Sequence, residues 1–167
     1  MNHTIVFELL HPDARVPQRA TEQSAGHDLH VYLKGREVRV CSEDGVEETR
    51  ACGSDEEAEL ALLRGDVALL PLGFKATLPR GFEAQIRMRS SWAFTRGLTV
   101  PNAPGTIDAD FPDEWMVLVR ASASGVTRIR HGDRVAQAVI SQFQTVAWQE
   151  GTVQPVTDRA GGIGSTG

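Results

Sequence analysis

The sequence predicts an all-β fold, a sandwich, jelly roll or barrel, and two observations favour it. Short apolar or alternating runs recur along the chain, and their period is two far more often than 3.6. Gly, Pro, Asp and Asn separate these runs at intervals near ~10 residues, which is typical of all-β proteins. No internal repeat or long linker divides the 167 residues. We therefore expect one compact domain.

Six runs each predict a strand. They span residues 4–10, 66–72, 73–79, 82–89, 114–121 and 134–143. Residues 35–52 are polar and predict a hairpin that turns at Asp44-Gly45, because Asp-Gly tolerates the positive φ of a type I′ turn. The one helix that the sequence favours begins at Ser54, where residues 54–57 resemble a capping box.

Composition and charge exclude several classes of protein. Seventeen basic residues stand against 22 acidic ones, a net charge of −5, which disfavours a broad surface for nucleic acid. No apolar run approaches the ~18 residues that span a bilayer. The N-terminal stretch has no basic region before its apolar residues, so we expect a first strand there and a cytoplasmic protein without a membrane partner. Cys41 and Cys52 fit no metal-binding spacing.

Two acids in the stretch PGTIDADF are candidates for chemistry. Asp108 and Asp110 are two residues apart and share a face if the stretch is a strand. Paired acids near Pro-Gly also form ordinary solvated turns. Because Ile107 and Phe111 flank them, at least one carboxylate is expected beside an apolar pocket, as a general base or a metal-associated group.

Three other segments carry groups that suit phosphate. Arg89 precedes Ser90 and Ser91, so a planar cationic fork stands beside hydroxyl and backbone donors. Asp28 follows a small-residue turn and is either a residue that caps its own backbone or part of a site. Gln137 lies in a strand that follows a turn and points either into the core, as a satisfied amide, or into a site as a donor.

The chain ends in RAGGIGSTG, residues 159–167. Such a Gly/Ser-rich end is a flexible tail or an arm that orders over an anion. In the second case the donors are Arg159 and the glycine N–H groups.

In this order the segments resemble the five-motif signature of the trimeric dUTPases. The motifs are AGHDL (25–29), RSS (89–91), GTIDADF (105–111), GDRVAQ (132–137) and the glycine-rich tail. The resemblance covers nearly the whole chain except residues about 34–58, which look like an insertion. It implies a dUTPase-like jelly-roll domain over residues 1–152 and a mobile C-terminal arm, residues 153–167, that closes over the active site.

The resemblance also implies the reaction. Such enzymes hydrolyse dUTP to dUMP and pyrophosphate by in-line attack of water at the α-phosphorus, which limits uracil in DNA and supplies dUMP. Asp108 takes the role of the general base. Asn102 and the backbone of hairpin 102–108, including Gly105 and Ile107, read the uracil edge. Phe111 replaces the usual tyrosine beneath the deoxyribose.

Further roles follow for the phosphates. By resemblance, Arg89, Ser90 and the backbone of Ser91 grip them from a neighbouring subunit of a homotrimer, together with Gln137. Asp28 supports hydrated Mg²⁺ through water. The implied arm residues are Arg159 at the γ-phosphate, Ile163 over the uracil, and Gly164, Ser165 and Thr166 as donors along the phosphate chain.

Two departures from the family pattern and several rival functions remain. The arm is one residue shorter than usual and has Ile163 where a phenylalanine stacks on uracil. Residues 111–115, FPDEW, lack the usual Arg-Gly pair before Glu114. The related dCTP deaminases have their catalytic glutamate ten residues beyond the hairpin aspartate, where this chain has Leu118. A non-catalytic nucleotide-binding module is a second alternative, and a plain structural jelly roll leaves the GSTG tail unexplained.

Overall fold

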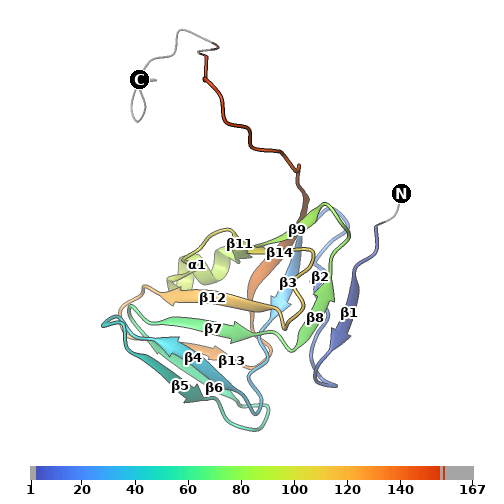
Figure 1. The fold of residues 1–167 in the computed structure, drawn as a ribbon. Helices are drawn as coiled ribbons and strands as arrows, with labels where there is room; N and C mark the ends of the chain where they lie inside the picture. The colour runs from blue at the N-terminus through green and yellow to red at the C-terminus, as the bar shows by residue number, and fades with distance from the viewer. Residues whose placement is uncertain (1–2, 155, 157–167) are drawn as a thin grey trace.

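The computed structural model describes residues 3–154 and 156, and its described part is almost entirely β (Figure 1). Every strand pair is antiparallel. The elements are β1 (Val6–Leu9), β2 (Gln18–Arg19), β3 (Gly26–His30), β4 (Glu37–Cys41), β5 (Glu47–Ala51), β6 (Glu59–Leu63), β7 (Val67–Pro71), β8 (Phe74–Thr77), β9 (Phe82–Met88), α1 (Ser90–Arg96), β10 (Leu98–Thr99), β11 (Gly105–Ile107), β12 (Met116–Ala121), β13 (Val126–Arg130) and β14 (Arg134–Gln142). The predicted all-β class and the six predicted strands are confirmed.

Two five-stranded sheets form the body of the domain. One has the order β10-β12-β7-β4-β5 and the other the order β11-β9-β14-β3-β2. Two smaller sheets, β1-β8 and β13-β6, accompany them. In the described part of the chain, no helix has the length and apolar character needed to cross a bilayer.

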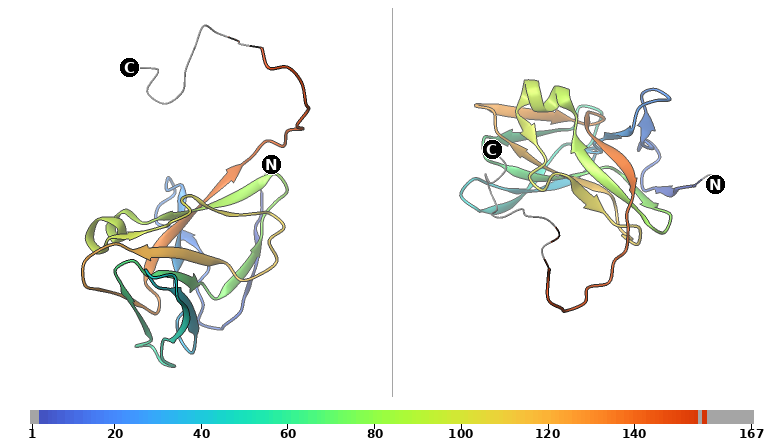
Figure 2. Two further views of the ribbon diagram at one scale, coloured as in Figure 1. Left: turned by 60° about the vertical axis from the view of Figure 1, so that its left-hand side comes forward. Right: turned by 90° about the horizontal axis from the view of Figure 1, so that it is seen from above.

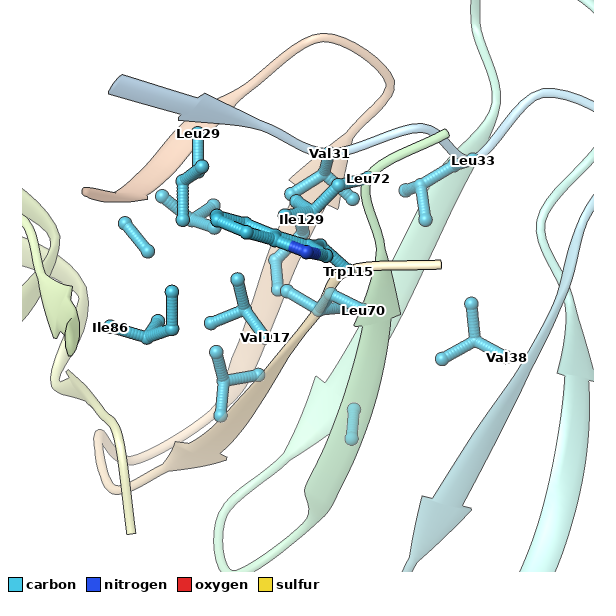
Figure 3. Close-up of a cluster of buried hydrophobic side chains, with 14 of the residues drawn as sticks. Leu29, Val31, Leu33, Val38, Leu70, Leu72, Ile86, Trp115, Val117 and Ile129 are labelled. Atoms are coloured by element: carbon cyan, nitrogen blue, oxygen red, sulfur yellow. The ribbon is translucent and has the colours of Figure 1, made fainter. Parts of the chain in front are cut away.

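The core lies between these sheets (Figure 3). Alternate side chains of the central strands point inward, so Leu29 of β3, Leu70 of β7 and Val117 of β12 are fully buried. Trp115 is 2% exposed, packs on Phe74 with ring centroids 5.4 Å apart, and donates its indole N–H to the Ala76 carbonyl. Burying an aromatic of this size fixes the chain just before β12.

The expected hairpin forms, but its turn differs from the prediction. β4 and β5 pair with each other, and β4 also pairs with β7, so that β5 is the edge strand of this sheet (Figure 1). Among the described residues only glycines have positive φ, so Asp44 does not adopt the type I′ geometry. Gly45, at φ 79°, donates to the Ser42 carbonyl, and Ser42 donates to Val46. This is a type I turn followed by a glycine bulge, in which only one residue needs positive φ.

The helix expected from Ser54 is absent, and a helix forms elsewhere. Residues 54–57 make a single turn, after which β6 begins at Glu59. Ala58, Leu60 and Leu62 are buried, so the stretch has a period of two and pairs with β13 as a strand. Pairing with a distant strand therefore overrides the local capping signal.

Candidate functional site

The outer face of the sheet β11-β9-β14-β3-β2 collects polar side chains from three neighbouring strands. Gln137 of β14 lies opposite Asp28 of β3 on one side and Arg87 of β9 on the other. Residues directly opposite in an antiparallel pair share a face, and Arg89 lies two residues beyond Arg87 on that same side. Three of the residues predicted to serve phosphate, Asp28, Arg89 and Gln137, are thus brought together.

Asp28 holds two arginines. Its carboxylate contacts Arg89 Nε at 3.2 Å and Arg134 Nη1 at 3.0 Å, while its side chain is only 14% exposed. Arg89 also donates from Nη1 to the Arg134 carbonyl. Asp28 therefore lies within a strand and orients the guanidinium of Arg89, so the alternative of a self-capping turn residue is wrong. Sequence reasoning missed Arg134, although it stands in the same GDRVAQ motif.

Gly26 makes room for Gln137. A Cβ atom built on Gly26 would lie 2.0 Å from Gln137 Oε1 and 2.9 Å from its Cδ. Real Cβ contacts are never this short, so any side chain at residue 26 must displace the amide. Gln137 is half-buried on the polar face rather than a core residue. Gly26 of the AGHDL motif therefore leaves the space that the side chain of Gln137, in the GDRVAQ motif, occupies.

Arg89 also begins the helix. It is the N-cap residue of α1, with extended φ and ψ, and its N–H bonds to the Val135 carbonyl. Ser90 and Ser91 are exposed in the first turn, where backbone N–H groups have no acceptor within the helix. The helix ends at Gly97, which adopts the left-handed conformation. This Gly97 is the signal that would have indicated a helix here.

The segment from Asn102 to Phe111 carries the candidate base. Gly105, Thr106 and Ile107 pair with β9 as β11, after which the strand ends, so Asp108 and Asp110 are not on a common strand face. Asp108 and Asp110 are both exposed, and the Phe111 N–H donates to the Asp108 carbonyl at 3.2 Å. Asp108 is therefore the first residue of this turn, and its side chain is exposed to solvent.

An apolar pocket lies against the same segment. Its lining includes Asn102, Gly105 and Ile107 together with Leu69, Met116 and Leu118. The Asn102 amide nitrogen lies 3.4 Å from the position that a Cβ atom on Gly105 would occupy. The two acids are not among the lining residues, so the expected carboxylate beside an apolar pocket is only adjacent to it in sequence.

Within a single chain, Asp108 lies far from Arg89. Ile107 pairs with Ala84, and Asp108 continues from there in the direction away from Arg89. Arg89 follows Ala84 by five residues and lies just beyond the end of β9, and five residues of extended chain span about 16 Å at ~3.3 Å per residue. A single chain therefore presents a phosphate-binding face and a base-bearing segment that are too far apart to contact the same phosphate.

The predicted arm residues Arg159, Ile163, Gly164, Ser165 and Thr166 lie outside the described residues. Up to residue 154 the chain after β14 has no regular structure and extends away from the sheets (Figure 2). Val146, Trp148 and Val153 are almost fully exposed there.

The described residues contain no group of three or more His, Cys, Asp or Glu side chains that could hold a metal. Mg²⁺ in nucleotide enzymes commonly binds through substrate phosphates, water and one or two carboxylates instead of a protein cage. Asp28 retains lone pairs beside those that its arginines use. This donor set fits a hydrated ion that arrives with the nucleotide.

His30 lies beside this cluster and is sensitive to acid. Burial, followed by the positive charges of Arg15 and Arg134, lowers the pKa of His30 below its usual 6.5, and its Nδ1 has no partner within the described structure. The unfolded chain therefore takes up this proton at a higher pH than the folded protein does. The stabilisation from neutral His30 is fully present above about pH 6.5. It is lost as the pH falls through the lower pKa of the folded protein.

We accordingly expect the melting temperature to fall between pH 7.5 and pH 5. Thermal denaturation across this range measures the effect. Replacing His30 by glutamine should flatten the pH dependence, whereas His3→Gln, at an exposed position, should not. An unchanged slope in the His30→Gln protein would contradict the assignment.

Comparison with known proteins identifies the family of this chain. The dUTPase family model matches residues 55–167. The deoxyuridine 5'-triphosphate nucleotidohydrolase of Desulfotalea psychrophila is 42% identical over 143 residues, which cover 82% of this chain and 95% of that protein. The chain belongs to the dUTPase family. The matched region begins at residue 55, within the last residues of the segment 34–58 expected to be an insertion.

Solved dUTPase structures share the fold. A mutant dUTPase of Staphylococcus bacteriophage 80alpha with dUpNHpp has a TM-score of 0.75 and 19% identity, with 98% of each chain covered. A mutant dUTPase of phage phi11 of S. aureus, whose structure reveals the coordination of a structural Mg(II) ion, has a TM-score of 0.69 and 17% identity, covering 90% of this chain and 98% of that one.

Proposed function

We propose that the protein is a dUTP diphosphatase that hydrolyses dUTP to dUMP and pyrophosphate. The observation that carries this proposal is the conjunction of dUTPase family membership with an exposed Asp108 at the end of β11 and a preorganised Asp28-Arg89-Gln137 face. We propose that residues 1–152 are the catalytic domain, whose last strand ends at Gln142, and that residues 153–167 are its arm.

Asp108 acts as the general base. Its carboxylate holds the attacking water and accepts its proton as the water oxygen approaches the α-phosphorus opposite the departing pyrophosphate. The exposed position at the mouth of the turn leaves this carboxylate accessible to water and substrate. Positioning is the main requirement, because the reaction needs the water in line with the leaving group.

The neighbouring segment selects the nucleoside. Asn102 and the backbone of Gly105 and Ile107 read the uracil edge. Phe111, with 37% of its surface exposed, stacks beneath the deoxyribose. An aromatic face at this place leaves no room for a 2′-hydroxyl.

Arg89, Gln137 and the Ser90-Ser91 segment bind the phosphates. The two arginine contacts of Asp28 hold Arg89 in place before substrate arrives, so less side-chain freedom is lost on binding. Mg²⁺, when bound with Asp28 as its water-mediated support, neutralises phosphate charge. Arg159, Gly164, Ser165 and Thr166 complete the enclosure from the arm.

The complete site requires more than one copy of the chain, and we propose a homotrimer. The separation of Asp108 from Arg89 supports shared sites. A second support is the outer face of β7 and β12, where Leu69, Met116 and Leu118 are apolar and only half-buried although the opposite face already packs in the core.

A charge on this face should prevent assembly. We expect the unmodified protein to have the mass of three chains and Leu118→Glu to have that of one, because burying an unpaired carboxylate in an apolar interface is strongly unfavourable. Light scattering coupled to size exclusion measures both. Arg128→Gln, at an exposed position of β13, serves as control. A trimeric Leu118→Glu protein would place the interface elsewhere.

Leu118 also argues against deamination, because it occupies the place of the dCTP deaminase glutamate. The decisive experiment compares pyrophosphate release from dUTP, dCTP, dTTP and UTP while ammonia is monitored. We expect release from dUTP and no ammonia from dCTP. Binding of dUTP without pyrophosphate release would support the non-catalytic module instead.

The arm gives a further prediction. Replacing Ile163 by phenylalanine should lower KM for dUTP about two- to ten-fold, since aromatic stacking on uracil contributes roughly 0.5–1.5 kcal/mol. Steady-state kinetics of the two proteins measure this. An unchanged or raised KM would contradict the stacking role.

A further inference from the structure

Arg36, in the inserted segment, contacts a residue that follows the base-bearing loop. Its Nη2 lies 2.7 Å from Glu114 Oε2, and its Nη1 donates to Glu114 Oε1 at 3.3 Å. The side chains are 22% and 11% exposed, so solvent screens this pair less than a surface pair. A two-point contact of this kind fixes the direction of the carboxylate as well as its position.

Glu114 is fixed from a second side by the backbone. Its Oε1 accepts the Gly73 N–H at 2.7 Å, and the next residue, Trp115, donates its N–H to the Phe74 carbonyl at 3.0 Å. Trp115 is buried in the core (Figure 3). Glu114 and Trp115 together therefore anchor the far end of the loop.

Apart from Ala109, which is half-buried and packs against the core, the loop itself has little other support. It leaves β11 at Ile107 and runs through Asp108 and Phe111, which are exposed. Between its two ends the described structure contains one backbone hydrogen bond, from the Phe111 N–H to the Asp108 carbonyl. The position of Asp108 thus depends on how firmly the two ends of the loop are held.

Arg36 is itself rigidly placed at the base of the insertion. Its carbonyl accepts the Cys52 N–H at 3.1 Å, and the preceding Gly35 donates to the Gly53 carbonyl at 2.7 Å. Its Nη1 also lies 3.2 Å from His11 Nε2. The base of the β4-β5 hairpin therefore closes at the backbone of Arg36 and holds it in place.

We propose that Arg36 is a positioning residue for the reaction: through Glu114 it holds the loop that carries Asp108 and Phe111. The inserted segment then contributes to catalysis although it touches no substrate. This inference rests on the proposed dUTP hydrolysis. The hairpin that reads uracil is held by its own pairing with β9, so Arg36 governs kcat more than KM.

Kinetics of Arg36→Gln and Arg36→Lys test the proposal. We expect Arg36→Gln to lower kcat about ten- to a hundred-fold, because small misplacements of a catalytic group have effects of that size, while KM changes less than about three-fold. Arg36→Lys should recover part of kcat, since an ammonium can still pair with Glu114 at one point.

Arg50→Gln is the matched control. Arg50 belongs to the same insertion and its 2.6 Å ion pair with Asp66 is equally protected, at 25% and 3% exposure, but it contacts nothing in the loop. We expect Arg50→Gln to lower the melting temperature at least as much as Arg36→Gln and to leave kcat within about two-fold. Equal losses of kcat in both proteins would reduce Arg36 to a structural role and overturn the proposal.

A double substitution tests whether Arg36 and Glu114 affect kcat through their contact with each other. Glu114→Gln keeps an acceptor for the Gly73 N–H but loses the charge that Arg36 pairs with. We expect Arg36→Gln and Glu114→Gln to lower kcat equally and the double variant to lower it no further. Additive losses of kcat, or a kcat of Arg36→Gln within two-fold of the unmodified protein, would refute the proposal that Arg36 acts through Glu114. Lack of dUTP hydrolysis in the unmodified protein would refute the proposed function instead.

Discussion

Replacing Asp108 by asparagine should lower kcat for dUTP hydrolysis about a thousand-fold, in the range expected for loss of a general base. Asparagine has nearly the same shape and still accepts a hydrogen bond, but it cannot take the proton from water. Affinity for dUTP should remain within about three-fold, because the uracil and phosphate contacts are made by other residues. Single-turnover kinetics and calorimetric binding of dUTP measure the two quantities separately.

Asp110→Asn is the matched control for this prediction. Asp110 is an exposed carboxylate in the same turn, two residues from Asp108, and removal of its charge changes the local field similarly. We expect its kcat to stay within about three-fold of the unmodified protein. Substantial residual kcat in Asp108→Asn, or an equal loss in Asp110→Asn, would remove Asp108 from its assigned role.

Replacing Gly26 by alanine should lower kcat/KM about a hundred-fold, because a Cβ atom 2.0 Å from Gln137 Oε1 must move that amide off the phosphate-binding face. The change adds one methyl group and makes no contact with substrate by itself. Steady-state kinetics with dUTP measure it, and circular dichroism reports whether the β fold is retained.

A second background isolates the mechanism of this effect. In a Gln137→Ala protein the added methyl group meets no amide, so Gly26→Ala should have almost no additional effect on kcat/KM. A further large loss in this background would mean that the methyl group disturbs the strand itself. The loss in the single variant would then have a structural origin.

The strands were predictable because their signal is local. Alternation of apolar and polar side chains marks a strand whose one face is buried, and β9 shows it clearly, whereas β7 and β12 are short apolar runs bounded by turn residues. The short helix α1 was not predicted, because its residues carry no buried stripe and only the C-terminal Gly97 marks its end. The apparent capping box at Ser54 led to the opposite error, because it predicted a helix that does not form.

The candidate site was predictable as a set of residues but not as a geometry. Asp28, Arg89, Gln137 and Asp108 stand in motifs that can be read directly. That Asp28 is paired with two arginines, and that Asp108 lies far from Arg89 in one chain, follow from strand register, which no local pattern specifies.

By itself the sequence determined the β class, the order of the motifs and the membership of the dUTPase family, since residue type and spacing are properties of the chain alone. Only the tertiary structure decided that Arg134 reaches Asp28 across 106 residues, that Gly26 leaves space for Gln137, and that the insertion meets Glu114 through Arg36. The physical reason is that such meetings depend on how strands pair across the whole core. A shift of one residue in that pairing would turn each of these side chains to the opposite face.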